Sequence, residues 1–168
     1  MEKIMWLVWG GVAFVAALRA GQSRRAMYAG RWALGVLFIL FGAVVNAIYL
    51  AAGTDYYEAF ADPSPFPFVR NKWESLVLPN QGLFIGLLIV AEATAGVFVL
   101  CGGRWTQAGL MALIGFHVGQ LAFGGVLWIW GPLMLVTLVL LLRAERQAGR
   151  GHEAHPSPVR ARRMSRVR

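Results

Sequence analysis

The chain has 168 residues, of which 58% are hydrophobic and only 14% are charged. Soluble domains carry about 25% charged residues, so this composition excludes an ordinary water-soluble fold. The formal net charge is +8, and the single cysteine, Cys101, excludes an intramolecular disulfide and a CxxC redox pair. We therefore expect one all-α integral membrane domain, a polytopic helix bundle.

Five apolar stretches approach the length needed to cross a bilayer. About 20 apolar residues cross ~30 Å of hydrocarbon, and about 17 are a working minimum. Gly124 and Gly125 provide a hairpin turn between the last two stretches, and Pro132 is tolerated inside a membrane helix. Residues 1–142 thus form a predicted membrane bundle, a four-helix core preceded by an N-terminal transmembrane helix. The predicted spans are residues 4–18, 32–52, 82–100, 105–123 and 126–142.

The basic residues predict how these spans are oriented. With five spans, residues 19–31, the link that carries Arg104 and residues 143–168 lie on one side, with 13 basic residues among them. Basic residues in short segments favour the cytoplasmic side, so we expect the N-terminus outside and the C-terminus in the cytoplasm. Cleavage of the first span as a signal peptide is the alternative, but it would place residues 19–31 outside, against this bias.

The outer segment, residues 53–81, contains several prolines and cannot be a span. Apolar residues recur at helical spacing between Val69 and Leu78, which predicts a short amphipathic helix in the membrane interface, ended by Pro79. Two interpretations stay open: a lid over a cavity that faces outward, and a connector whose apolar face rests on lipid or helix ends.

The last segment, residues 143–168, is polar and rich in Arg, and we expect it to be disordered. Attraction to anionic lipid is the favoured interpretation, because each basic residue near the surface contributes about 1 kcal/mol. Charge alone also fits nucleic acid, but the membrane context argues against that partner.

Among the polar residues inside the predicted spans we single out four: Asn46, Glu92, His117 and Gln120. Such groups are unfavourable in lipid, so each is a candidate for ligand binding. We expect one polar pocket among the second, third and fourth spans that opens outward, with Glu92 and His117 as its acid/base or hydrogen-bonding pair. The alternative is that they only hold the helices together, by bonds worth ~0.6–2 kcal/mol each.

Residue spacing predicts which helix faces are turned inward. On the second and third spans, glycines share a face with Asn46 and with Glu92. On the fourth span, small residues such as Gly115 and Gly119 form one face and allow close helix approach, while His117 and Gln120 lie opposite.

Several chemistries lack the residues they need. With one intramembrane His, two-His haem ligation is excluded, and a closed zinc site lacks ligands. No P-loop or nucleophile elbow is present, so we assign no metal ligand and no catalytic residue, and leave open whether the chain is an enzyme.

Two segments resemble the DoxX/DoxD-like integral membrane family. The first is GRWALGVLFILFGAVVNAIYL, with Arg31 at its inner end and Gly42 in its middle. The second is EATAGVFVLCGGRWTQAGLMALI, where Glu92, Gly96 and Arg104 belong to an E-x3-G…G-x-R pattern. The resemblance covers roughly residues 31–143 and implies a four-helix membrane core. The long outer segment and the additional first span depart from the family pattern.

The resemblance also implies a class of function. Some members of that family are subunits of thiosulfate:quinone oxidoreductases or partners of thiol and oxidative-stress enzymes. We expect a redox-associated subunit that holds a quinone as its cofactor, or a similar lipophile. The alternative is a non-catalytic scaffold that binds another protein or a second copy; a transporter fits less well, because paired discontinuous segments are lacking. The preference for Ala, Gly and Arg over Lys is typical of a GC-rich bacterium, so we expect a bacterial plasma membrane.

Overall fold

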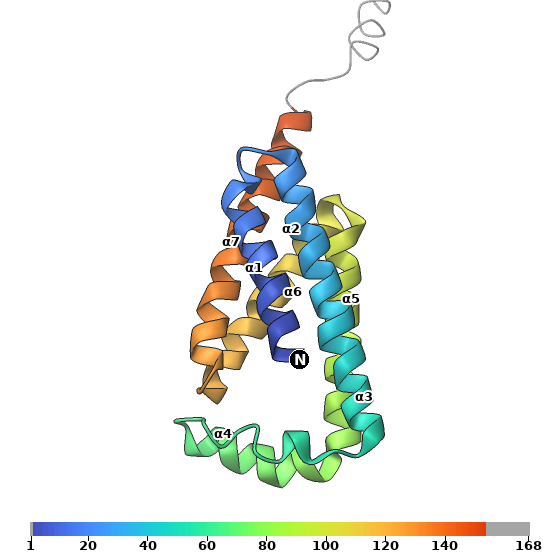
Figure 1. Ribbon diagram of the computed structural model, residues 1–168, viewed down its shortest axis with the longest axis vertical. Helices are drawn as coiled ribbons and strands as arrows, with labels where there is room; N and C mark the ends of the chain where they lie inside the picture. Colours follow the sequence, from blue (N-terminus) through green and yellow to red (C-terminus); the bar gives the residue numbers. More distant parts are fainter. Residues whose placement is uncertain (1, 154–168) are drawn as a thin grey trace, which may run out of the picture.

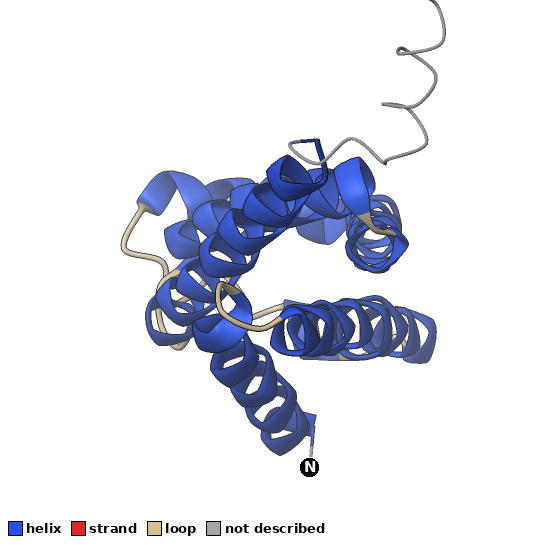
Figure 2. Cartoon of the chain, turned by 90° about the horizontal axis from the view of Figure 1, so that it is seen from above, coloured by secondary structure: helices blue, strands red, loops and turns tan. Residues whose placement is uncertain are grey.

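The computed structural model describes residues 2–153, and every regular element in that part of the chain is a helix (Figure 1, Figure 2). The predicted all-α fold is therefore confirmed. The longer helices run along a common axis, whereas α4 lies across one end of the bundle (Figure 1). The α-helices are α1 (Glu2–Ala20), α2 (Arg24–Val36), α3 (Val45–Ala52), α4 (Pro67–Lys72), α5 (Gln81–Cys101), α6 (Gly103–Gln120) and α7 (Leu127–Glu153).

Within the described residues, three continuous helical stretches are long and apolar enough to cross a membrane. They are Arg24–Ala52, Pro67–Cys101 and Leu127–Arg150. The apolar part of α1, Met5–Ala20, is shorter, and α6 is not among the three. The membrane-type character of the helices is thus confirmed. The assignment of five spans and a four-helix core stays a prediction.

The turn between α1 and α2 is much shorter than the predicted loop of residues 19–31. Helix α1 extends to Ala20 and α2 begins at Arg24, so most of that segment is helical. The Ser23 hydroxyl accepts a hydrogen bond from the backbone N–H of Ala26 at 3.3 Å and caps α2. Arg is a good helix former, and its long side chain can reach water from within a helix. The Arg-rich segment is therefore mostly helical, and the prediction of a loop there is wrong.

Helix α7 continues past the predicted end of the membrane bundle. It contains Pro132 and runs to Glu153, so residues 143–153 are helical and the prediction of a disordered tail from residue 143 is wrong there. Ala144 and Glu145 are buried against the bundle, which gives this part of α7 packing partners beyond its apolar span. The rest of the predicted tail, residues 154–168, lies outside the described residues.

The helices pack in a ring in which glycines permit close contact. Helix α5 packs against α2 and against α6, and α7 packs against α6 and α1. A Cβ atom at Gly35 would lie 2.5 Å from the Leu100 side chain, and one at Gly96 would lie 2.8 Å from Ile39. The prediction that these glycine faces contact protein is therefore confirmed at Gly35, Gly42 and Gly96, but not at Gly53, whose Cβ position has open space around it.

Helix α6 presents the opposite face to the bundle from the one its small residues suggest. A Cβ atom at Gly115 or Gly119 would meet nothing within 4 Å. Leu110, Leu113 and His117 are buried instead. Gly109, one turn before Leu113, makes the close contact with α5, since a Cβ atom there would lie 2.8 Å from the Val99 backbone nitrogen. The prediction of close packing on the Gly115 face is therefore wrong for this chain alone.

A buried ion pair joins three helices at one end of the bundle. Arg31 Nη1 of α2 lies 3.1 Å from Glu145 Oε1 of α7, and both side chains are more than nine-tenths buried. The same guanidinium donates from Nε to the Val99 carbonyl at 3.1 Å and from Nη2 to the Leu100 carbonyl at 3.0 Å. These carbonyls belong to the last turn of α5, where no further helical N–H can reach them. Arg31 thus ties α2, α5 and α7 together.

The outer segment crosses the other end of the bundle and is attached to the turn between α6 and α7. The Ser64 hydroxyl donates to the Ala122 carbonyl at 2.6 Å. Phe60, Trp73 and Phe123 form an aromatic cluster with ring centroids 5.1–5.4 Å apart. These contacts fit the lid interpretation and also a firmly docked connector, so both stay open.

The predicted amphipathic helix before α5 is present, but Pro79 does not end it. Helical structure runs through α4 and a π-helical segment, Trp73–Val77, into a 3₁₀ turn, Leu78–Asn80, that leads directly to α5. Pro79 lies in the first turn of the 3₁₀ segment, where a missing N–H leaves few hydrogen bonds unmade. It therefore redirects the chain rather than stopping the helix.

The predicted hairpin turn at Gly124 and Gly125 is confirmed. Both residues have positive φ angles, 74° and 58°. A Cβ atom at Gly124 would lie only 2.4 Å from the Pro63 carbonyl oxygen of the outer segment. Glycine is therefore required at residue 124 both for the backbone conformation and for the docking of the outer segment.

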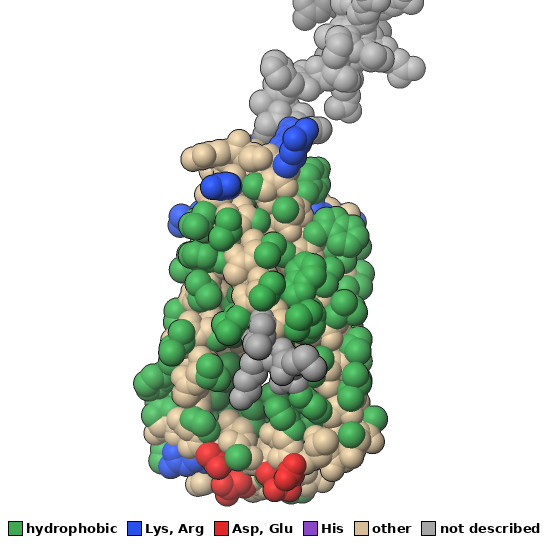
Figure 3. Space-filling model, viewed as in Figure 1, with side chains coloured by type: hydrophobic (Ala, Val, Ile, Leu, Met, Phe, Trp, Pro, Cys, Tyr) green, Lys and Arg blue, Asp and Glu red, His purple; other side chains and the backbone are tan. Residues whose placement is uncertain are grey.

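The charged side chains gather at the two ends of the molecule. Figure 3 shows Lys and Arg at the end where α7 finishes, Asp and Glu together with some Lys or Arg at the other end, and mostly apolar side chains between them. Asp55, Glu58 and Asp62 are exposed in the outer segment. Large apolar side chains such as Leu87 and Ile129 are exposed along the middle, as expected for a surface that faces lipid.

Removing Arg31 should destabilise the bundle strongly. Arg31→Ala leaves Glu145 buried without its partner, and loss of one member of such a pair typically lowers the free energy of unfolding by about 3–5 kcal/mol. Unfolding of the detergent-purified protein measures this change. Arg25→Ala, at an exposed position six residues earlier on α2, is the control and should leave stability nearly unchanged. Equal effects of the two substitutions would contradict the role given to Arg31.

Gly124→Ala should release the outer segment from the α6–α7 turn. The new methyl group clashes with Pro63, and strain at a backbone conformation reserved for glycine adds roughly 1–3 kcal/mol. Proteolysis of residues 53–66 should be faster than in wild type. Gly53→Ala is the matched control, because Gly53 also has a positive φ, 62°, but open space around its Cβ position. If both variants are cleaved at the same rate, the docking contact is unimportant.

Candidate functional site

The candidate site is centred on a carboxyl group buried inside the bundle. Glu92 lies in the middle of α5 and is 5% exposed. Its carboxyl group lies against Gly42, where a Cβ atom would be 3.0 Å from the carboxyl carbon. Any larger residue at position 42 would displace the carboxyl group. Gly42 therefore provides the space in which Glu92 lies.

The amide of Asn46 binds this carboxyl group. Asn46 lies at the start of α3, one turn after Gly42, and its Nδ2 donates to Glu92 Oε2 at 2.9 Å. The structure thus brings together two of the four polar residues singled out from the sequence. This hydrogen bond between Asn46 and Glu92 joins two helices. It also fixes the orientation of the Asn46 amide, because Nδ2 faces Glu92 and Oδ1 is turned away from it.

A tyrosine of the outer segment completes the group. The Tyr57 hydroxyl donates to Asn46 Oδ1 at 2.8 Å, and Tyr57 is 3% exposed. The indole N–H of Trp73 donates to the Tyr57 carbonyl at 2.9 Å and holds the tyrosine in place. The donors point in one direction, from Tyr57 to Asn46 to Glu92. This polar chain joins the outer segment to the carboxyl group inside the bundle.

The chemistry of the polar chain follows from its donors. Burial raises the pKa of Tyr57 from 10.0 to about 12, and the neighbouring Tyr56 and Glu92 raise it further in the same direction. The phenol therefore keeps its proton at physiological pH and remains a donor to Asn46. One oxygen of Glu92 accepts from Asn46. The carboxyl group can use its other oxygen to bind a polar group of a ligand.

The helix that carries Gly42 and Asn46 is distorted beside the site. Between α2 and α3, residues Leu37–Val44 are π-helical. π-helical turns are rare inside α-helices and often occur at functional sites, because the wider turn shifts the side chains that follow it. Here the shift occurs just before Asn46, which has to meet Glu92.

His117 does not share this arrangement. It is 1% exposed, and its Nδ1 lies 2.9 Å from the Leu113 carbonyl of its own helix. A carbonyl can only accept, so Nδ1 carries a proton. The ring packs edge-on against Phe38 and Phe116 with centroids 5.7 Å and 5.5 Å apart. No hydrogen bond or ion pair joins His117 to Glu92 in the described part of the chain, so the expected pair is not formed there.

Gln120 is also separate from the polar chain. It is half-buried near the end of α6, and its Oε1 atom is buried without a hydrogen-bond partner among the residues that the structure describes. The four candidates therefore divide into a bonded pair, Asn46 and Glu92, and two residues of α6 with other surroundings.

Sequence reasoning missed Tyr57, because it lies outside the predicted spans. The available signal was its spacing: it follows Asn46 by eleven residues, directly after the second span ends. Sequence reasoning also missed the ion pair of Arg31, which it used only for orientation and for the family pattern. The available signal was Glu145, an isolated acid among the arginines that follow the last span.

No family model, curated protein or solved structure matches this chain. The resemblance to the DoxX/DoxD-like family therefore depends on residues 30–50 and 92–114 alone.

The raised pKa of Tyr57 predicts a delayed ionisation. A group that ionises at about 12 in the folded protein but near 10 when unfolded loses its proton more easily on unfolding, so stability should fall as the pH rises through this window. Phenolate absorbance during alkaline titration measures this. Tyr57→Phe should remove the ionisation step near pH 12 and leave the others.

The chain contains four tyrosines, so Tyr28→Phe serves as the matched control for that titration. Tyr28 is exposed on α2, and its substitution should leave the step near pH 12 in place. Loss of the same step in both variants would show that Tyr57 is not buried as described.

Proposed function

We propose that this protein is a membrane subunit that holds a quinone or a similar lipophile at the outer end of its bundle. The observation that carries the proposal is the polar chain from Tyr57 through Asn46 to Glu92. It places a carboxyl group inside an apolar bundle and connects it to the outer segment. A carboxyl group that served only to join helices would be an unfavourable choice in lipid, where an amide suffices.

The chemistry of the site fits the head group of such a ligand. A quinone carries carbonyl oxygens that accept hydrogen bonds and, once reduced, hydroxyl groups that donate them. A carboxyl group can serve in both cases, according to its own protonation. The apolar surface around the site would accommodate the tail. The chain binds and positions the lipophile in this proposal, and electrons come from a partner redox protein.

We also propose a family, a number of spans and an orientation for the chain. It would be a DoxX-like bundle of five spans, in which α1 precedes a four-helix core formed by the α2–α3 stretch, α5, α6 and α7. The N-terminus would lie outside and the C-terminus in the cytoplasm of a bacterial plasma membrane. The separation of basic and acidic side chains at opposite ends supports this orientation (Figure 3).

A scaffold role is the second candidate, and the exposed glycine face of α6 supports it. Gly115 and Gly119 lie on that face with open space beside them. Small residues allow a helix of another protein, or of a second copy, to approach closely in lipid. In this case Glu92 and Asn46 would join helices, and no ligand would be bound.

Small molecules extracted from the gently purified protein distinguish the two functions. We expect quinone in the wild-type extract by mass spectrometry, and a loss of about tenfold in Glu92→Gln, the size expected when a hydrogen bond to a charged group is removed. Glu58→Gln is the matched control, since Glu58 is an exposed acid of the outer segment. It should retain the quinone.

The variants must also elute as the wild type does in size-exclusion chromatography, because binding is compared only between folded proteins. Lipid alone in all three extracts, with a stably bound second protein, would favour the scaffold. Equal quinone in Glu92→Gln and wild type would reject Glu92 as the binding group.

A further inference from the structure

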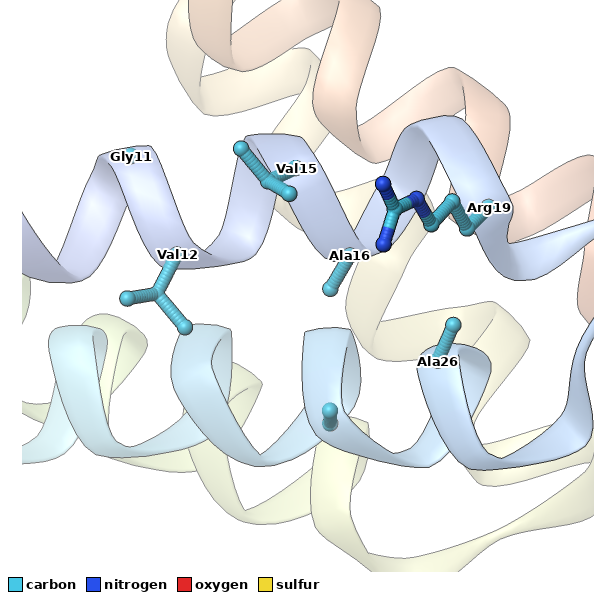
Figure 4. Close-up of a pocket in the computed structure, with 7 residues that line it drawn as sticks. Gly11, Val12, Val15, Ala16, Arg19 and Ala26 are labelled. Atoms are coloured by element: carbon cyan, nitrogen blue, oxygen red, sulfur yellow. The ribbon is translucent and has the colours of Figure 1, made fainter.

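A groove between α1 and α2 runs along the outer surface of the bundle, away from the Glu92 site (Figure 4). Its volume is about 500 Å³. It is open to the surroundings and almost entirely apolar. The lining residues are Gly11, Val12, Val15, Ala16, Arg19, Ala26 and Ala29.

Small side chains create the width of this groove. Gly11 has nothing within 4 Å of its Cβ position, and Ala26 and Ala29 line the side formed by α2. Val12 and Ala16 point toward α2, as Figure 4 shows. In a membrane this shallow apolar groove can hold an acyl chain along the surface of the bundle, with α1 on one side and α2 on the other.

The groove has a positively charged end. Arg19 is its charged lining residue, and Figure 4 shows its side chain folded back toward Ala16, over the groove. The turn that follows leads to exposed Arg24 and Arg25 at the start of α2. The first turn of α2 contains no acidic residue, and its helix dipole also favours an anion.

We propose that this groove binds an anionic phospholipid, with one acyl chain between α1 and α2 and the phosphate beside Arg19. The positive charge at one end of the groove matches the phosphate of such a lipid, and the apolar lining beyond it matches an acyl chain. A transmembrane helix fits less well, because an apolar helix offers no anionic group to Arg19 at the end of the groove. The groove lies at the Arg-rich end, so a lipid there would belong to the same leaflet that the basic residues face.

This binding would have a structural consequence. The α1–α2 hairpin also carries Gly30, where a Cβ atom would lie 2.8 Å from Leu141 of α7. A lipid that bridges α1 and α2 would hold this hairpin against α7 at the end where Arg31 lies. The inference is independent of the quinone proposal, because it concerns a different surface and a different ligand.

Binding of phosphatidylglycerol to delipidated protein in detergent tests the proposal, with phosphatidylcholine as the uncharged-headgroup comparison. Native mass spectrometry reads out the retained lipid. We expect wild type to retain phosphatidylglycerol preferentially. Arg19→Gln should weaken it about fivefold, the effect of one basic residue near a lipid phosphate. Gly11→Leu adds a side chain to the groove at a position whose Cβ would meet nothing within 4 Å, and it should remove the lipid bound there.

Matched substitutions outside the groove provide the controls. Arg104→Gln removes an exposed Arg at the same end of the bundle, and Gly115→Leu adds the same side chain at an open position on α6. Both should bind lipid as wild type does. Ala29→Leu is a second groove-filling variant in case Gly11→Leu fails to fold, as judged by circular dichroism.

The other outcomes would overturn the proposal. Equal losses in groove and control variants would mean that lipid binds nonspecifically around the bundle. Equal retention of both lipids would remove the role of Arg19. Unchanged retention in both groove-filling variants would show that the lipid lies elsewhere, and a change of oligomeric state in those variants would make a second copy the occupant.

Discussion

The bundle depends on the pairing of Arg31 with Glu145 in apolar surroundings. A charge buried in a membrane protein is unfavourable unless another charge and hydrogen bonds compensate it. Arg31 obtains both, from Glu145 and from the Val99 and Leu100 carbonyls. The last turn of α5 gains donors that it lacks within its own helix. One side chain thereby fixes the relative positions of α2, α5 and α7, and the polar interior further along the bundle rests on that arrangement.

At the other end, the helices are held by the outer segment rather than by charge. Ser64 and the aromatic cluster around Trp73 attach this segment to the α6–α7 turn, and Tyr57 inserts beneath it to reach Asn46. A change at the α6–α7 turn can therefore reach Glu92 through Trp73 and Tyr57, because these residues form one continuous set of contacts. This gives the outer segment a physical connection to the buried carboxyl group, whether it opens as a lid or stays closed.

Much of the site was predictable from residue type and spacing, but its pairing was not. Glu92 and Asn46 stand out because polar residues in apolar helices have to find partners. Gly42 and Gly96 indicated correctly that their faces contact protein. Which partner each polar residue takes depends on helix rotation and on the order of helices in the ring, and neither has a local signature. His117 illustrates this, since a carbonyl four residues earlier in its own helix met its need.

The sequence by itself determined the all-helical fold, the apolar character of the helices, the hairpin at Gly124 and the separation of charge between the two ends. These properties follow from composition, period and single-residue backbone preferences, which act over a few residues. Only the tertiary structure decided that α6 turns Gly115 outward, that His117 bonds its own helix instead of Glu92, that α7 continues past residue 143, and that Tyr57 joins Asn46. Those outcomes depend on side chains far apart in the chain, whose contacts compete with one another and are settled only when the whole bundle packs.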